Sequence, residues 1–192
     1  MPKGYSAVLA SARTAGTARN TFTAAVTLLP DHARCPMTPY DWFEGRVLRV
    51  MAAGSISNLV TTQPTFTFEF RLGPTANIVA FTTGANLTSA TVHTNVPWWL
   101  DILLTVRAVG SGTAANIMGQ GLVTSRAFLD AGTGGDLTTL GHASLLAPET
   151  APAVGTGFDS TVVNVADLLV SCSASNVGNA IQLHQYILED LN

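Results

Sequence analysis

Charged side chains are scarce in this sequence. Only 11% of its 192 residues are Asp, Glu, Lys or Arg, whereas an average globular chain has about 25%. A folded monomer of this mass exposes about 8,700 Å², so its surface would hold roughly one charge per 400 Å². Small polar and apolar atoms must make up the rest, which is typical of a subunit that other protein partly covers.

Lysine is almost absent, and Lys3 is the only one. The other basic residues are arginines, scattered along a chain of net charge −3. No basic stripe could follow a phosphate backbone, so we expect no nucleic-acid partner. One explanation for the preference for arginine over lysine is that these cations lie in protein interfaces, where the forked guanidinium pairs with carboxylates. The other is codon bias in a GC-rich genome.

The sequence also lacks the motifs of catalytic and metal sites. Cys35 and Cys172 share no short spacing, which excludes a CxxC motif, and Cys172 is expected to be a small buried side chain. The four histidines form no HxH, HxxxH or HExxH pair, and there is no G-x-S-x-G or phosphate-binding loop. Residues 130–136 hold two acids among glycines, as a calcium loop or a plain flexible loop would. We therefore expect no enzyme, no catalytic or metal-binding residue and no cofactor.

No long apolar run is present. The most apolar window, residues 96–109, is interrupted by Pro97, Asp101 and Arg107 and is too short to cross a membrane. Residues 3–12 contain no sustained apolar stretch of the kind found in signal peptides. We expect no membrane contact.

Alternation of apolar and polar residues is the dominant pattern. It is clearest at residues 65–72, where Phe66, Phe68 and Phe70 point one way and Thr and charged residues the other. Further strands are expected at residues 21–29, 42–51, 78–82, 98–109, 114–124, 162–173 and 181–188. Gly, Pro and Asn turns predict three hairpins, joining 65–72 to 78–82, 98–109 to 114–124, and 162–173 to 181–188.

The end of the chain has two readings. Residues 183–191 fit a helix or a strand, and the alternation together with the preceding turn favours the strand. As a strand, it would place Ile181, Leu183, Gln185 and Ile187 on one face. No other window keeps a helical pattern beyond two turns. The sequence therefore predicts an all-β fold, an antiparallel β-sandwich of jelly-roll type with seven to nine strands.

The domain prediction is a single sandwich over residues 21–192. Residues 1–20 are small, polar and rich in Thr and Ala, and we expect an extended arm that is ordered only where a neighbour holds it. Residues 128–157 form a long loop insertion rich in Gly, Ala, Thr and Pro. Its leucines are apolar, and we expect them to be shielded from water either by a neighbouring subunit or by one end of the sheet. They are Leu137, Leu140, Leu145 and Leu146.

The dipeptide Trp98-Trp99 is the most unusual feature of the apolar strands. On a strand one ring faces inward and the other outward. The outer ring is then an anchor for another subunit, since aromatic residues dominate interface hot spots, or a stacking platform for a glycan. The candidate interface residues are Trp42, Trp98, Trp99, Leu137, Leu140, Leu145, Leu146, Arg13 and Arg19.

The last third of the chain carries a resemblance. Residues 159–165, 173–176 and 178–183, followed by Leu-Glu-Asp-Leu-Asn at 188–192, form a strand, a small polar turn with Asn, and a closing strand. This resembles the end of small β-sandwich virion proteins of tailed bacteriophages, and the strands near 42–54 and 66–73 fit the same plan. The insertion at 128–157 departs from it.

The resemblance implies a jelly-roll capsid decoration (cement) protein or the base of a head fibre. Such a protein would be made in the host cytoplasm, form a homo-oligomer, most often a trimer, and bind the major capsid protein on the capsid surface of the virion. The alternative function is a receptor- or glycan-binding module of a tail or head fibre that uses Trp98 or Trp99.

Overall fold

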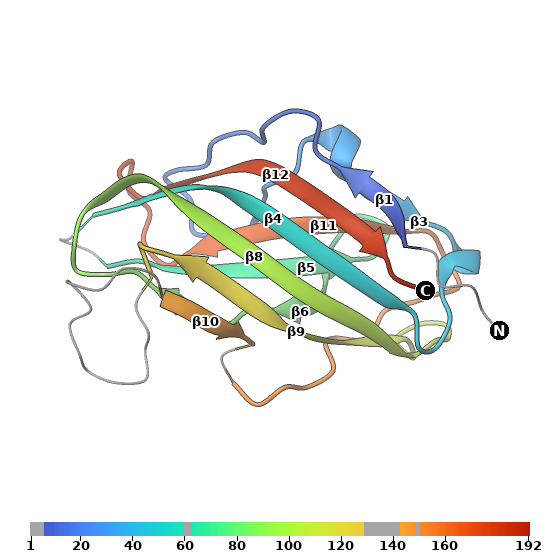
Figure 1. Cartoon of the computed structure of the whole chain (residues 1–192). Coiled ribbons are helices and arrows are strands. Elements are labelled where there is room, and N and C mark those ends of the chain that lie inside the picture. The colour runs from blue at the N-terminus through green and yellow to red at the C-terminus, as the bar shows by residue number, and fades with distance from the viewer. Residues whose placement is uncertain (1–5, 60–62, 129–142, 149) are drawn as a thin grey trace.

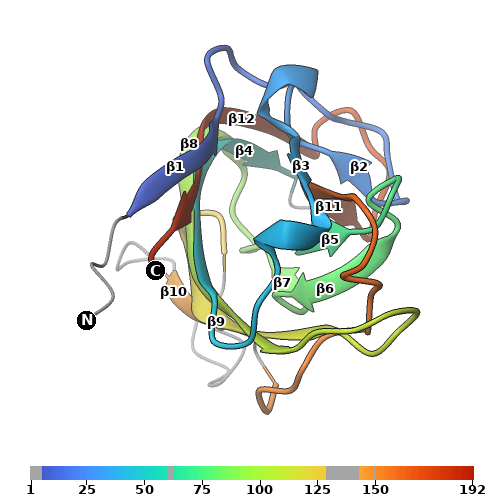
Figure 2. The same cartoon turned by 90° about the vertical axis from the view of Figure 1, so that its right-hand side faces the viewer.

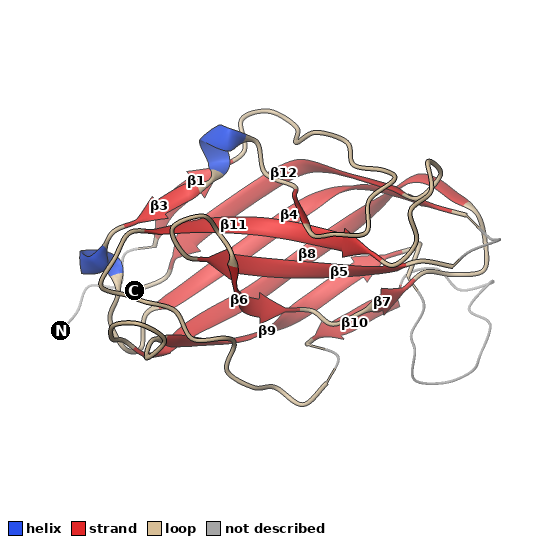
Figure 3. Ribbon diagram, turned by 180° about the vertical axis from the view of Figure 1, so that it is seen from behind, coloured by secondary structure: helices blue, strands red, loops and turns tan. Residues whose placement is uncertain are grey.

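Two antiparallel sheets pack face to face in the computed structural model, which describes residues 6–59, 63–128, 143–148 and 150–192 (Figures 1 and 3). In spatial order, the first sheet contains β1 (Ala7–Ser11), β12 (Ala180–Asp190), β4 (Val47–Asn58), β8 (His93–Ala108), β9 (Asn116–Ser125) and β10 (Ala143–Ala147). The second contains β2 (Val26–Thr27), β11 (Asn164–Cys172), β5 (Thr65–Leu72) and β6 (Ile78–Thr82), with β3 (Cys35–Met37) beside β11 and β7 (Asn86–Leu87) beside β5.

The helices of the described residues are two single 3₁₀ turns, η1 (Asp31–Ala33) and η2 (Pro39–Asp41). The prediction of an all-β sandwich is therefore confirmed. The described strands number twelve rather than seven to nine, and β2, β3 and β7 have only two or three residues each.

Eight of the twelve described strands have the order of a jelly roll, to which β3, β7, β9 and β10 are added. We number β1, β2, β4, β5, β6, β8, β11 and β12 from one to eight in chain order. The first sheet then runs one, eight, three, six, and the second runs two, seven, four, five. This is the jelly-roll arrangement, and β9 and β10 extend the first sheet beyond β8.

The jelly-roll order corrects one predicted hairpin. The hairpins β5–β6 and β8–β9 are present as expected. However, β11 pairs with β2, β3 and β5, whereas β12 pairs with β1 and β4 in the other sheet. The turn residues between β11 and β12 therefore carry the chain across the sandwich, which Figure 2 shows end on.

The boundaries of β4 differ from the expected strand at residues 42–51. The strand runs from Val47 to Asn58, and alternate residues are buried along its whole length. Gly54 does not end it, because the glycine sits within the sheet at a close approach: a Cβ there would lie 1.9 Å from the carbonyl oxygen of Gln182. Glycine in a strand often marks such a contact.

A β-bulge in β12 changes which residues face the core. The register shifts between Leu183 and Gln185, so that the buried residues are Ile181 and Leu183 before the bulge and Tyr186 and Leu188 after it. The prediction that Ile181, Leu183, Gln185 and Ile187 share one face is therefore wrong. One extra residue reverses the alternation of every side chain that follows.

Part of the N-terminal segment pairs with its own domain. After β1 has paired with β12, the backbone N–H of Ala12 bonds to Tyr186, that of Gly16 to Leu183 and that of Arg19 to Ile181. The described part of the expected arm therefore pairs with the edge of β12, whose backbone groups would otherwise be unpaired.

The insertion at residues 128–157 contains β10, which pairs with β9. Further on, the N–H of Gly155 donates to Ile117 of β9 and that of Thr156 to Val79 of β6. This segment therefore links the two sheets along one side. Residues 129–142 lie outside the described residues, and so do Leu137, Leu140 and the candidate calcium loop.

Aromatic side chains fill the space between the sheets. Phe66, Phe68 and Phe70 of β5 point inward, and the rings of Phe68 and Trp98 lie 5.0 Å apart. The buried ring of Tyr186 belongs to the same core, but its hydroxyl finds no hydrogen-bond partner among the described residues. Burial raises the pKa of Tyr186, so this hydroxyl stays protonated and keeps an unpaired donor.

We predict that Tyr186→Phe stabilises the protein. Removing a buried, unpaired hydroxyl abolishes its desolvation cost, so the free energy of unfolding should rise by about 1 kcal/mol in urea denaturation. Tyr40→Phe is the control, because Tyr40 is 96% exposed and its hydroxyl is hydrated. A Tyr186→Phe variant less stable than the wild type would contradict the prediction.

Candidate functional site

The outer face of the first sheet carries three exposed leucines, here called the leucine patch. They are Leu103 of β8, Leu122 of β9 and Leu146 of β10, exposed by 47%, 44% and 72%. Leu122 and Leu146 are direct cross-strand partners. Leu103 lies diagonally from Leu122, because Leu122 pairs with Asp101 two residues earlier in β8. Such neighbours are within contact distance on one sheet face, so the three leucines form one apolar surface.

A hollow of about 400 Å³ borders the leucine patch. Leu122 and Leu146 line it on the sheet side, and Pro148 and Pro152 on the side of the following loop. The surface is therefore shaped as well as apolar, a combination typical of protein contact sites.

An ion pair adjoins the patch. Arg49 Nε and Nη2 donate to the two carboxylate oxygens of Asp101 at 2.9 and 2.6 Å. Both side chains are partly exposed, and the hydrogen bonds to Asp101 raise the pKa of Arg49 further. The forked geometry suits burial in an interface, where the pair brings no net charge.

The second sheet has a different outer face. On β5 its outward residues are Thr65, Thr67, Glu69 and Arg71, and the last two form an ion pair at 2.5 Å. The apolar surface of the first sheet is therefore a local feature and not a property of both faces.

A second hollow, of about 430 Å³, lies beside Trp99 on the first sheet, and we call it the Trp99 hollow. Trp99 is 45% exposed. Its register partners are Ala53 of β4 on one side and Thr124 of β9 on the other, and Ala53 in turn pairs with Gln185 of β12. The lining residues are Ala53, Gly54, Pro97, Trp98, Trp99, Thr124, Ser125, His184 and Gln185.

The predicted interface residues fall into separate groups. Trp42 packs edge to face on Phe158 at 4.8 Å, and Trp98 is buried with its indole N–H donating to the carbonyl of Gln182. Neither ring is available to a partner, which corrects both predictions. The alternation of β8 turns Trp98 inward, and Trp42, which directly follows η2, packs inward on Phe158. Leu145 is buried as well, whereas Trp99 and Leu146 face outward.

The two predicted arginines lie away from the outer face of the first sheet. Arg13 is exposed, and its backbone N–H donates to His32. The guanidinium of Arg19 donates to the carbonyl of Thr27. Sequence reasoning missed Leu103 and Leu122, although the alternation within their strands could have placed them outside. It also missed His184 and Gln185, because a bulge leaves no clear mark in a sequence.

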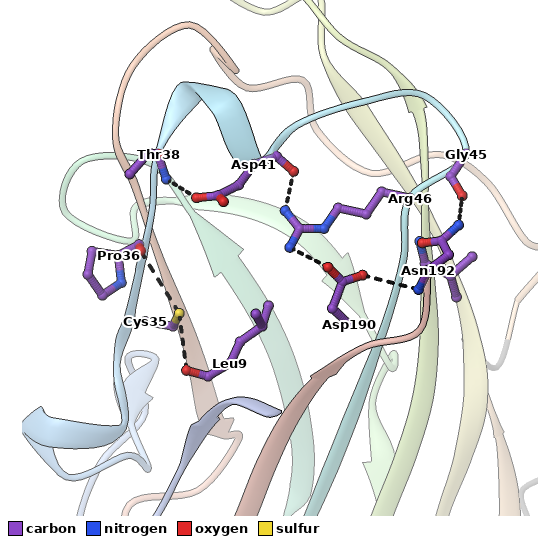
Figure 4. Close-up of polar contacts among 10 residues, drawn as sticks. Leu9, Cys35, Pro36, Thr38, Asp41, Gly45, Arg46, Asp190 and Asn192 are labelled. Atoms are coloured by element: carbon purple, nitrogen blue, oxygen red, sulfur yellow. Dashed lines mark hydrogen bonds and ion pairs between the residues drawn. The ribbon is translucent and has the colours of Figure 1, made fainter. Parts of the chain in front are cut away.

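A polar cluster joins the end of β12 to the start of β4 (Figure 4). The buried guanidinium of Arg46 donates to the backbone carbonyl of Asp41 and, at 2.9 Å, to the carboxylate of Asp190. Asn192 accepts from the N–H of Val47 and donates to the carbonyl of Gly45, both at 2.9 Å. All of these hydrogen bonds join groups of this one chain. We therefore interpret the cluster as structural and call it the clasp.

Reactive groups are few. Burial raises the pKa of both thiols, Cys35 and Cys172, so neither is an activated nucleophile. Cys172 is buried as expected. Within the described ranges, no three His, Cys, Asp or Glu side chains come together as metal ligands would, and no helix there has the length and apolarity of a membrane span.

No family model matches the chain, and no curated protein matches it. Among solved structures, it is similar to the CBM2 module of the evolved Dit of Lactobacillus casei BL23 phage J-1. The two chains are 9% identical with a TM-score of 0.35, over 99% of this chain and 98% of the other. A likeness of this degree carries no argument about function.

We predict that Asp190→Asn destabilises the protein by about 3 kcal/mol, because it leaves the buried Arg46 without an anion. The matched control is Asp101→Asn, which breaks a partly exposed pair and should cost less than about 1 kcal/mol. Urea denaturation of both variants measures the difference. Equal losses would show that the clasp is no stronger than a surface pair.

A second prediction concerns Asp167, buried between Thr27 and Arg34 at 2.7 and 2.9 Å. Burial raises its pKa above the ordinary 3.8, although both partners act against the rise. The folded state therefore holds this proton more tightly than the unfolded state, and its stability contribution is lost as the pH rises from 3.8 through the raised pKa. The unfolding free energy of the wild type relative to Asp167→Asn should fall over that range.

Asp159 provides a comparison of opposite sign. The hydroxyl and N–H of Thr161 lower its pKa by donating to its carboxylate, so its contribution is lost as the pH falls through the lowered value. The wild type relative to Asp159→Asn should therefore gain stability with rising pH. The same slope for both variants would contradict the assignment.

Proposed function

We propose that the protein is a structural subunit of a tailed-phage virion, a capsid decoration protein that forms homo-oligomers and binds the major capsid protein. The observation that carries the proposal is the leucine patch. A monomer in water gains nothing from displaying Leu103, Leu122 and Leu146 together, whereas an assembly buries them at a gain of about 25 cal/mol per Å².

Three further observations support it. The jelly-roll order of the strands is common among viral capsid and lectin domains. The closing segments of the sequence resemble those of phage β-sandwich virion proteins. The low charge density leaves much of the surface suited to contact with other protein.

Contact between copies of the chain is the first step of this function. A stable interface covers about 800 Å² on each partner, so the three leucines would form its centre and the surrounding Gln and Thr side chains its rim. The Arg49–Asp101 pair suits an isologous or a cyclic contact, since it offers one cation and one anion side by side. A trimer is the form that we propose, with another part of its surface on the capsid shell.

We predict that the wild-type protein is an oligomer in solution. The double variant Leu122→Ser with Leu146→Ser should have a lower molar mass, closer to the protomer mass of 20.0 kDa. Light scattering at micromolar concentration measures the masses. Because the contact is apolar, added salt should change the wild-type mass little. Val177→Ser is the matched control, since Val177 is 71% exposed in a turn outside the patch.

Co-sedimentation with capsids that lack the protein tests the second step. The wild type and Val177→Ser should pellet with the capsids, and the double leucine variant should pellet less. A wild-type protein that remains monomeric and stays in the supernatant would refute the proposed function.

A further inference from the structure

We propose that the Trp99 hollow is a binding site for a neutral saccharide. The inference does not rest on the assembly proposed above, because none of the three leucines of the patch lines this hollow. It rests on the way in which four neighbouring strands, β12, β4, β8 and β9, build the hollow from an aromatic side chain, a low floor and several hydrogen-bonding groups.

The first element is the aromatic platform. Trp99 points out of the sheet, lines the hollow and is almost half exposed, whereas the adjacent Trp98 is buried in the core. An exposed indole offers a broad, rigid and apolar face together with one N–H donor. The C–H faces of a pyranose ring match such a surface in shape and polarity.

The second element is the floor. Ala53 lies in register between Trp99 and Gln185, and Gly54 follows it. The floor is low because Ala53 carries only a methyl group. Gly54 pairs with the buried Trp98 and so faces the core, where a Cβ would clash with the carbonyl of Gln182. Trp99 and Gln185 stand two strand spacings apart, about 9.6 Å, which leaves room for one sugar ring beside the indole.

The third element is the bulge in β12. In a regular strand, His184 and Gln185 would point to opposite faces, but the register shift turns both toward the outer side, and both are exposed. Bulges of this kind occur beside binding sites, where they redirect a side chain. The bulge therefore supplies an imidazole and an amide at the same wall of the hollow.

The polar groups suit hydroxyl ligands. His184 Nε2 contacts Ser55 Oγ at 3.1 Å, and its other ring nitrogen, Nδ1, can donate to or accept from a hydroxyl. The amide of Gln185 can both donate to and accept from a hydroxyl, and Thr124 adds a hydroxyl on the far side of Trp99. An apolar pocket with a few such groups is the usual form of a small-ligand site.

The charge of the lining residues selects among saccharides. Asp, Glu, Lys and Arg are all missing from the residues that line the hollow. Arg49, on the same face of the sheet, pairs with Asp101, and the exposed Arg126 follows Ser125 without lining the hollow. A sialylated or phosphorylated sugar would therefore meet no Lys or Arg within the hollow, which should prefer neutral hexoses and N-acetylhexosamines.

The test uses the full chain in two assays. The first is an array of neutral hexose and N-acetylhexosamine oligosaccharides with sialylated counterparts. The second is ligand-detected NMR with the methyl glycosides of glucose, galactose, mannose and N-acetylglucosamine at millimolar concentration, which reports weak binding directly. We expect neutral sugars to bind and sialylated counterparts to bind no better.

The variants separate stacking from folding and from assembly. Trp99→Ala should lower the association constant by roughly tenfold, which corresponds to about 1.4 kcal/mol, and Gln185→Ala should lower it as well. Trp99→Phe should retain part of the binding, because it keeps an aromatic face. Leu122→Ser with Leu146→Ser should leave the association constant for each methyl glycoside unchanged.

Three outcomes would overturn the proposal: no saccharide bound in either assay, binding that Trp99→Ala leaves intact, or a preference for sialylated ligands. Because the leucine variant tests assembly at a separate surface, failure of the saccharide site would leave the oligomer measurement unaffected, and the reverse also holds.

Discussion

The alternation of side chains along each strand is the constraint on which this structure depends. Both sheets must direct one side of every strand into a shared core, and β4 keeps this alternation without a break over its twelve residues. Once the core side is fixed, the residues of the opposite side are fixed too. The outer surface of the first sheet, with Trp99 and the three leucines, follows from packing requirements on the other side of the same strands.

The sequence predicts the strands whose alternation is strong and local. Residues 65–72 and 78–82 match β5 and β6 at both ends, and the hairpin of β8 and β9 is present as expected. The same local pattern predicts that Trp98 and Trp99 point to opposite sides. In these cases, the information that fixes the structure lies within a few residues of the position concerned.

Features that depend on distant partners were not predictable in the same way. The turn after β11 has the composition of a hairpin loop, but the pairing of β12 with β4, more than 120 residues earlier in the sequence, sends the chain to the other sheet. The position of Trp42 against Phe158 and the attachment of the N-terminal segment to β12 are likewise long-range contacts. The bulge at His184 depends on the register with β4, so the wall of the Trp99 hollow becomes visible only in three dimensions.

The place of β12 in the first sheet has a consequence for how the molecule is made. This strand lies between β1 and β4, yet it is the last of the three to leave the ribosome. Until residues 180–190 have been synthesised, β1 has no partner in the sheet, and one edge of β4 stays open. This sheet therefore cannot be completed before β12 has been synthesised, and the large sequence separation of its paired strands implies slow folding.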